Sequence, residues 1–126
     1  MNRLDRFCEA IMSFEGWRPG SRSYRNCNPG NMRWSPVMVR QDDGYAVFNT
    51  FADGWFALLK DVSIKASGKS RHGIGPSSSI LEFFKVYAPS KDSNHPELYA
   101  AYVIDRARLP IDCTLAELLK YEGGDE

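Results

Sequence analysis

Hydrophobic residues recur at helical spacing at the start of the chain. Leu4, Phe7, Cys8 and Ile11 fall on one stripe when each residue turns by about 100°, and Glu15 falls at the centre of the same stripe. A glycine, a common helix stop, follows directly. The pattern predicts an amphipathic helix whose apolar face carries one carboxyl group near its C-terminal end.

This position predicts an unusual pKa for Glu15. Burial disfavours the charged form of a carboxyl group, and so does the negative end of the helix dipole, so both effects raise the pKa. A carboxylic acid that keeps its proton near neutral pH can act as a general acid, which cleavage of an acetal bond between two sugars requires. The alternative is an ordinary glutamate at a helix end that faces solvent.

A β-hairpin is predicted after the first helix. Residues 31–39 and 45–51 are short stretches rich in aromatic and β-branched side chains. Residues 41–44 between them, Gln-Asp-Asp-Gly, are typical of a turn. The two stretches are therefore expected to pair as the strands of the hairpin.

Helices are predicted for most of the remaining chain. Thr50 and Asp53 resemble a capping box ahead of a helix over about residues 51–66, and residues 67–79 form a loop rich in glycine and serine. The next helix starts at Ile80 and is ended by Pro89.

Two further helices complete the predicted layout. One starts at the Asn94, Pro96 and Glu97 signal and runs to about Leu109. Its predicted apolar face consists of Leu98, Ala101, Tyr102 and Ile104. Thr114 and Glu117 form a capping box before the last helix, and residues 123–126 are expected to fray. The predicted fold class is α+β, mainly α, in a single domain over residues 1–126.

Composition and charge narrow the class of protein. The 126 residues are 43% hydrophobic, which suits one domain with a real core. The 16 basic and 16 acidic residues balance, and the isoelectric point is about 6.7. The chain therefore has no excess of positive charge that would indicate nucleic acid as its main partner.

Cysteine and histidine usage excludes several kinds of chemistry. Cys8, Cys27 and Cys113 are odd in number and lack the CxxC spacing, which argues against a disulfide framework and a zinc site. The two histidines, His72 and His95, lie near no cysteine motif. We expect no metal, no other cofactor and no Cys/His nucleophile.

The N-terminal residues are charged where a signal peptide would be apolar. Arg3, Asp5, Arg6 and Glu9 interrupt any hydrophobic run. We expect synthesis in the cytoplasm without a signal peptide, no membrane insertion, and a monomer.

Basic residues concentrate after Glu15, namely Arg18, Arg22, Arg25 and Arg33. Arg18 and Arg22 are interpreted as a solvated face. Arg25 and Arg33 either hold a polar or anionic ligand near the acid or are solvated as well.

Several motifs together resemble one family. They are Phe14-Glu15-Gly16, the Arg-Asn-x-Asn-Pro-Gly-Asn run from Arg25 to Asn31 with Met32-Arg33 after it, Tyr45-Ala46-Val47-Phe48, Gly54-Trp55, and Tyr87-Ala88-Pro89 with the later Asn94. The chain resembles phage and prophage muramidases related to goose-type lysozyme and soluble lytic transglycosylases. The resemblance covers nearly the whole sequence and implies a lysozyme-like fold.

The same resemblance implies an activity and its site. It implies cleavage of the β-1,4 bond between N-acetylmuramic acid and N-acetylglucosamine in peptidoglycan glycan strands, with Glu15 as general acid and then base. Asn28, Asn31, Arg33, Tyr87 and Asn94 are the predicted substrate-binding residues. Asparagine amides can donate to and accept from sugar groups, but Asn28 and Asn31 can equally serve only their own turn. Tyr87 can instead be a core residue at a helix end, and Asn94 a helix N-cap.

The presence or absence of a second catalytic carboxylate distinguishes hydrolysis from lytic transglycosylation. A hydrolase needs one that faces the acid, whereas a lytic transglycosylase uses the C6 hydroxyl of the muramic sugar and needs none. Asp42 and Asp43 in the predicted turn, and Asp53 in the predicted cap, are weak candidates. Both reactions stay open, with action on the bacterial cell wall in the periplasm or from a virion.

Two rivals stay open as well. A wall-binding or virion structural module on the same fold keeps an aromatic groove without needing an acidic Glu15. A toxin or secretion-associated muramidase has the same chemistry in another setting.

Overall fold

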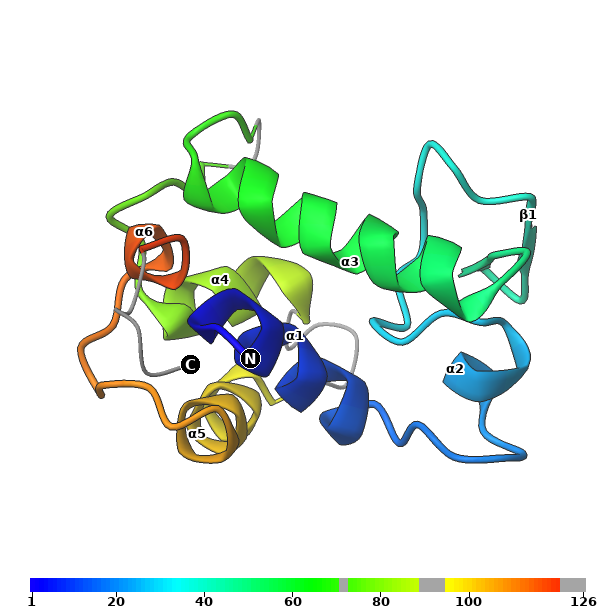
Figure 1. Ribbon diagram of the computed structural model, residues 1–126, viewed down its shortest axis with the longest axis horizontal. Helices are drawn as coiled ribbons and strands as arrows, with labels where there is room; N and C mark the ends of the chain where they lie inside the picture. Colours follow the sequence, from blue (N-terminus) through cyan, green and yellow to red (C-terminus); the bar gives the residue numbers. More distant parts are fainter. Residues whose placement is uncertain (71–72, 89–94, 121–126) are drawn as a thin grey trace.

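The computed structural model, which describes residues 1–70, 73–88 and 95–120, is mainly helical and carries a small hairpin at one end (Figure 1). The elements in chain order are α1 (Arg3–Phe14), α2 (Arg22–Arg25), β1 (Arg40–Asp42), β2 (Tyr45–Val47), α3 (Phe51–Ala66), α4 (Ile80–Tyr87), α5 (Pro96–Arg106) and α6 (Leu115–Leu118). The strands pair antiparallel. The predicted class, α+β and mainly α, is confirmed.

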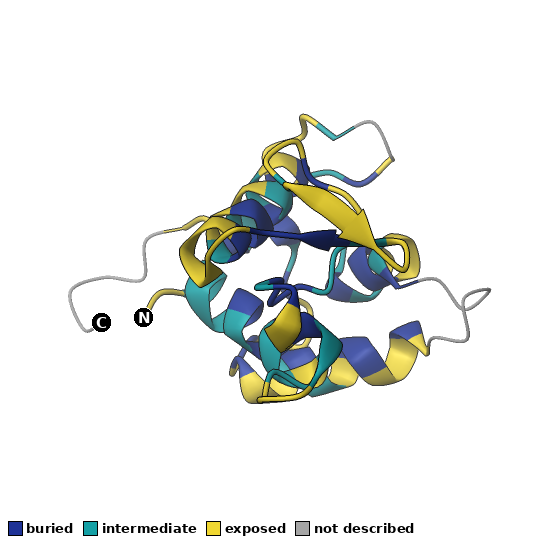
Figure 2. Ribbon diagram, turned by 90° about the vertical axis from the view of Figure 1, so that its right-hand side faces the viewer, coloured by how far each residue is buried: buried dark blue, intermediate teal, exposed yellow. Residues whose placement is uncertain are grey.

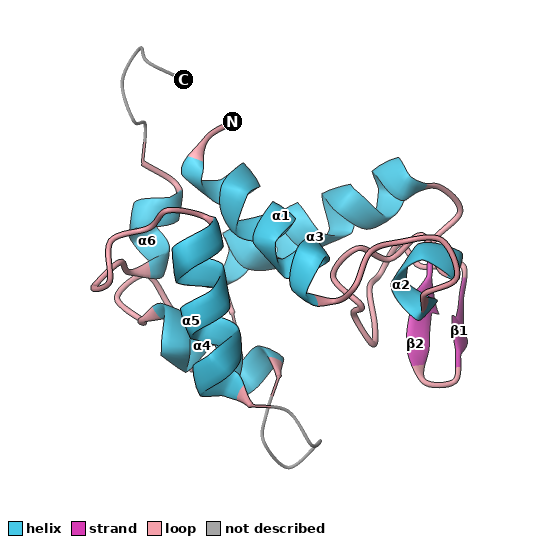
Figure 3. Ribbon diagram, turned by 90° about the horizontal axis from the view of Figure 1, so that it is seen from below, coloured by secondary structure: helices cyan, strands magenta, loops and turns pink. Residues whose placement is uncertain are grey.

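The long helix α3 connects two parts of the molecule. The hairpin and α2 lie near its N-terminal end, whereas α4, α5 and α6 lie towards the other end (Figures 1 and 3). Helix α1 packs against α5, α3 and α6, and α4 packs against α5. The main core therefore lies between the helices, with Phe7, Leu58, Phe84, Val103 and Leu115 among its fully buried members.

The first helix forms as its hydrophobic stripe predicts. Asn2 caps its start, because its side-chain oxygen accepts a hydrogen bond of 2.8 Å from the Asp5 backbone N–H. Phe7, Cys8 and Ile11 are completely buried. The helix ends at Phe14, and Glu15 is its C-cap residue.

The hairpin exists, but its predicted first strand is wrong. Residues 31–39 contain no strand, and β1 instead includes Gln41 and Asp42, which we assigned to the turn. The actual turn is Asp43-Gly44, with positive φ angles of 51° and 81°. An Asp-Gly pair adopts such angles readily and joins two strands with a two-residue loop, so it sets the register in which Asp42 faces Tyr45.

The two strands differ in burial. All three residues of β1 are exposed, whereas Ala46 and Val47 of β2 are buried (Figure 2). Ala46 and Phe48 pack with Ala57 of α3 in a small separate core. The hairpin is thus attached to α3 through its second strand, and the predicted second strand of residues 45–51 is shortened to three residues.

Local capping signals set the ends of the later helices. Helix α3 spans residues 51–66 as predicted, with Thr50 accepting from the Asp53 N–H at 3.1 Å. The capping box of Thr114 and Glu117 before α6 is confirmed. Helix α4 starts with another capping box, Ser79 and Glu82, which our prediction had missed. Pro89 and residues 123–126 lie outside the described residues.

Helix α5 departs from the prediction at its start and on its buried face. Its N-cap residue is His95, not Asn94, and it ends at Arg106. Tyr99 and Val103 are buried, whereas Leu98, which we assigned to the apolar face, is 65% exposed. The stripe Tyr99, Ala100, Val103 and Ala107 has equally good helical spacing, and packing against α1 and α4 selects it.

The helix α2 was not predicted. It is a single turn, capped by Ser21, whose hydroxyl accepts from the Tyr24 N–H at 3.2 Å. Among the described residues, no helix has the length and apolar character needed to cross a membrane.

Candidate active site

Glu15 lies at the C-terminal end of α1 with its carboxyl group between two hydrogen-bond donors. Its Oε2 accepts a hydrogen bond of 2.6 Å from the Tyr99 hydroxyl of α5. Its Oε1 accepts one of 3.2 Å from Nδ2 of Asn31, in the loop before the hairpin. Three segments distant in sequence therefore meet at this one carboxyl group.

The pKa of the Glu15 carboxyl group is raised above its usual value. Burial is the largest cause, and the hydrogen bonds from Tyr99 and Asn31 act in the opposite direction but do not outweigh it. The direction agrees with the expectation from the sequence. A carboxyl group in this setting holds a proton at a higher pH than a solvated glutamate does.

Tyr99 is the important site residue that sequence reasoning missed. It is 2% exposed, and its ring stacks on Phe14 and Phe84 at centroid distances of 3.9 and 4.1 Å. Burial and the neighbouring charge of Glu15 raise the pKa of its phenol well above the usual value, so it stays an O–H donor. The helical stripe through Tyr99 and Val103 was the signal that could have revealed it.

Asn31 lies in the left-handed region, with φ of 48°, which asparagine tolerates better than most residues. Its Oδ1 is buried and has no hydrogen-bond partner among the described residues. An amide has a donor on one side and an acceptor on the other, so Asn31 can pair with Glu15 either ionised or protonated after a flip of the amide. It is therefore suited to a carboxyl group that changes its protonation state.

The position of Asn28 corrects our expectation of a direct ligand contact. The side chain is fully buried. Its Nδ2 donates to the backbone oxygens of Met32 and Ala46 at 2.8 and 2.9 Å, and its Oδ1 accepts from the Met32 N–H at 3.0 Å. The amide holds the loop that carries Asn31 against β2, which is the turn-stabilising alternative.

The same loop is pressed against the start of α3 at Gly54. A Cβ atom at this position would lie 1.9 Å from the backbone oxygen of Cys27 and 2.9 Å from Cδ of Pro29. Only a residue without a side chain permits this approach. The loop that positions Asn31 is thus fixed from two sides, by Asn28 and by Gly54.

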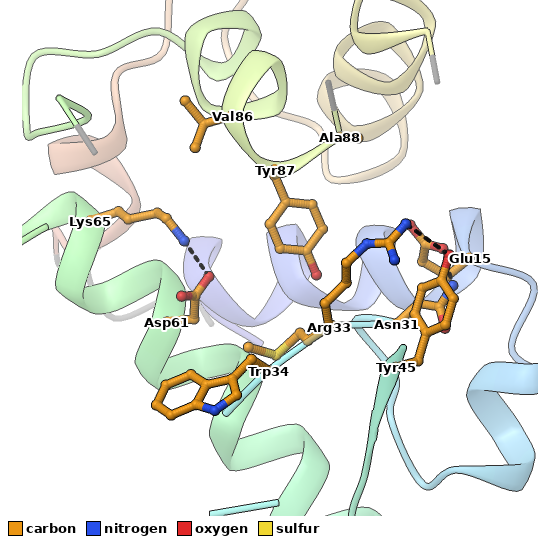
Figure 4. A pocket seen from close by; sticks show the side chains of 11 residues that line it. Glu15, Asn31, Arg33, Trp34, Tyr45, Asp61, Lys65, Val86, Tyr87 and Ala88 are labelled. Carbon is orange, nitrogen blue, oxygen red and sulfur yellow. Dashed lines mark hydrogen bonds and ion pairs between the residues drawn. The ribbon is translucent and has the colours of Figure 1, made fainter. Parts of the chain in front are cut away.

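Glu15 opens into a pocket of about 350 Å³, within the roughly 300–1,000 Å³ usual for ligand sites. Figure 4 shows Glu15, Asn31, Arg33 and Tyr45 at one side, and Asp61 and Lys65 at the other. Tyr87 projects from α4 between the two groups. The remaining lining residues are Met32, Trp34, Val86 and Ala88.

Tyr87 shares the pocket with Glu15 but its hydroxyl is already engaged. It donates a hydrogen bond of 2.5 Å to the backbone oxygen of Gly30, and its ring stacks on Phe83. The side chain therefore supports the loop from the pocket side. Its hydroxyl oxygen can still accept a hydrogen bond from a ligand.

Arg33 is the arginine of the basic segment that reaches the pocket. It lies over the Tyr45 ring at 4.6 Å and donates to the Tyr45 hydroxyl at 3.4 Å. Arg22 instead pairs with Asp43, and Arg25 donates to the Gly20 backbone oxygen. Asn94, the last predicted binding residue, lies outside the described residues.

The pocket contains a second carboxylate that we did not predict. Asp42, Asp43 and Asp53 are exposed and line no part of this pocket. Asp61 of α3 does line it, and its Oδ2 lies 2.6 Å from Nζ of Lys65 one helical turn later.

The described residues contain no group of three or more histidine, cysteine, aspartate or glutamate side chains arranged to hold a metal ion. Comparison of the chain with protein-family models, with curated proteins and with solved structures finds no match. A functional assignment therefore rests on the residues of the pocket and on the motifs of the sequence.

Proposed function

We propose that the protein is a muramidase with a lysozyme-like fold that cleaves the β-1,4 bond between N-acetylmuramic acid and N-acetylglucosamine in peptidoglycan. The observation that carries this proposal is the half-buried Glu15, with its raised pKa and its two neutral donors, at the side of an open pocket. The motif resemblance from Phe14 to Asn94 supports the same reaction. The site of action is the bacterial cell wall.

Glu15 performs two proton transfers in the proposed reaction. The protonated carboxyl group gives its proton to the glycosidic oxygen, and the bond from C1 of the muramic sugar to that oxygen breaks. The resulting carboxylate then takes a proton from the hydroxyl that attacks C1. Tyr99 and Asn31 hold the carboxyl group in place and stabilise the ionised form between the two steps.

The attacking hydroxyl is proposed to be the C6 hydroxyl of the muramic sugar, which makes the reaction a lytic transglycosylation. Hydrolysis requires a second carboxylate that activates water or attacks C1. Among the described residues that line the pocket, the other carboxylate is that of Asp61. It lies at the opposite side from Glu15, and its Oδ2 is engaged by the Lys65 ammonium at 2.6 Å, so it is not a free carboxylate facing the acid (Figure 4). The C6 hydroxyl needs no such partner.

Mass spectrometry of the muropeptides released from purified cell walls tests the proposal. Anhydro-muramic ends are expected, and reducing ends would replace the transglycosylase by a lysozyme. If the folded protein binds the walls but releases no muropeptide, it is a wall-binding or virion structural module, and the proposed activity is wrong.

A further inference from the structure

The Asp61–Lys65 pair is the least exposed ion pair shown among the described residues. Its side chains are 28% and 10% exposed, against 77% and 39% for the Asp43–Arg22 pair. Removing two charges from water is costly, and a buried pair often contributes little net stability. A pair of this kind in the wall of a pocket therefore suggests a role in binding.

Lys65 is held so that its ammonium group stays at the pocket. Its Nζ lies 5.6 and 6.0 Å from the ring centroids of Phe83 and Tyr87, a cation–π arrangement on the side of α4. An ammonium group has three donors, and Asp61 is the acceptor that the described residues provide. Two donors remain for water or for a ligand.

The charges around the pocket favour an anionic ligand. When Glu15 is protonated, as the proposed reaction requires at its start, the charged side chains among the described residues that line the pocket are two cations, Arg33 and Lys65, and one anion, Asp61. Among these side chains, one positive charge is then in excess. Because the two cations lie at opposite sides of the pocket, a ligand charge near Lys65 does not compete with the reaction at Glu15 (Figure 4).

We infer that Lys65, oriented by Asp61, binds a carboxylate carried on the lactyl side arm of the muramic sugar. The inference rests on the proposed function, because the backbone sugars of the glycan are neutral and the lactyl arm carries the acid. The carboxylate is that of the lactyl group itself in a strand without peptide, or belongs to the stem peptide in a strand that has it. Lys65 thus distinguishes a muramic sugar from a plain N-acetylglucosamine unit.

Binding measurements in the Glu15→Gln background test this without turnover. Isothermal titration compares three probes: neutral chitin tetrasaccharide, a peptide-free tetrasaccharide with lactyl carboxylates, and the same tetrasaccharide with stem peptides. We expect about tenfold tighter binding of at least one carboxylate probe than of chitin, equivalent to about 1.4 kcal/mol. The probe that gains identifies the source of the carboxylate.

Adding Lys65→Gln should remove this preference and leave chitin binding unchanged. Because a lone Asp61 can disturb folding, the neutral pair Asp61→Asn with Lys65→Gln provides a second variant of similar shape, and it should behave in the same way. The matched control is Lys85→Gln, which changes an exposed lysine of α4 that is not among the residues lining the pocket, and it should keep the preference.

The outcomes separate the two proposals. Equal binding of all three probes, or a preference that survives in both Lys65 variants, overturns the role of Lys65 and leaves the muramidase standing. A parallel loss of chitin binding in both Lys65 variants assigns the pair to structure and also overturns it. If no probe binds to the folded Glu15→Gln protein, the proposed function fails, and this inference fails with it.

Discussion

One pocket holds two carboxyl groups whose surroundings differ. Glu15 has two neutral donors, Tyr99 and Asn31, and burial raises its pKa. Asp61 instead has the Lys65 ammonium as its partner, at 2.6 Å. The two acids of one pocket thus differ in the charge of their partners, since neutral groups hold the buried Glu15 and an ammonium group holds Asp61. The proposed function gives the proton transfers to the first acid, and the inferred ligand contact gives a positioning role to the second.

The largest expected effect is the loss of activity in Glu15→Gln. The substitution keeps the shape of the side chain and removes the exchangeable proton, so wall lysis should fall by about a hundredfold or more. Turbidity clearing of purified walls measures it, with circular dichroism to show that the fold is kept. Clearing at the wild-type rate would exclude Glu15 as the acid.

Asp61→Asn should affect stability more than chemistry. The substitution leaves the Lys65 ammonium buried without a countercharge. Chemical denaturation should therefore show a loss of about 2 kcal/mol in the free energy of unfolding. This loss is smaller than that expected for a fully buried pair, because the Asp61 side chain is partly exposed. Cleavage should stay within about tenfold of wild type, with unchanged products.

A matched control for this variant is the double change Asp42→Asn with Asp43→Asn on the exposed hairpin, which should alter neither property. If folded Asp61→Asn loses activity to the extent that Glu15→Gln does, Asp61 takes part in the reaction and the contrast between the two acids disappears.

Tyr99→Phe sharpens the comparison through the pH profile. The phenol hydrogen bond lowers the pKa of Glu15, so its removal should raise that pKa further and move the alkaline limb of the activity profile to higher pH. The rate at the optimum should fall by about tenfold, since one stabilising donor is lost. Tyr102→Phe, which removes a hydroxyl bonded to Ser13, is the control. An unshifted profile would show that Tyr99 only packs.

The smallest expected effect concerns stability and pH. A carboxyl group whose pKa is higher in the folded than in the unfolded state costs stability as pH rises through the interval between the two values. Glu15→Gln should therefore melt at the same or a higher temperature than wild type at pH 7, and the difference should shrink below the unfolded pKa, roughly pH 4. If Glu15→Gln melts at a lower temperature than wild type at pH 7 but not at low pH, the raised pKa of Glu15 is contradicted.

Local signals in the sequence predicted α1, α3, α4 and α6 and the position of Glu15 at the end of the first helix. The stripe that ends at Glu15 and the capping pair Thr114 with Glu117 depend on residues within a few positions of each other, so periodicity and capping rules suffice. The first strand was misplaced because composition outweighed the Asp43-Gly44 turn signal.

Long-range contacts were beyond such rules. Tyr99 reaches Glu15 from 84 positions away, and only the packing of α5 on α1 selects the helix face that carries it. The same is true of Asp61, since nothing within α3 shows that its side chain shares a pocket with Glu15. The resemblance indicated Asn31 but could not separate it from Asn28, which faces inward.

Gly54 has a consequence for engineering the protein. Replacing a glycine inside a helix by alanine usually gains about 1 kcal/mol, which makes such positions attractive in stabilisation screens. At Gly54 the added methyl group would overlap the Cys27 carbonyl, so the loop and the helix would have to separate. Asn31 lies on that loop and donates to Glu15, 16 positions earlier in the chain. A change at Gly54 made for heat resistance would therefore shift a hydrogen-bond donor of the proposed acid. Position 54 should therefore be held constant in any library built on this scaffold.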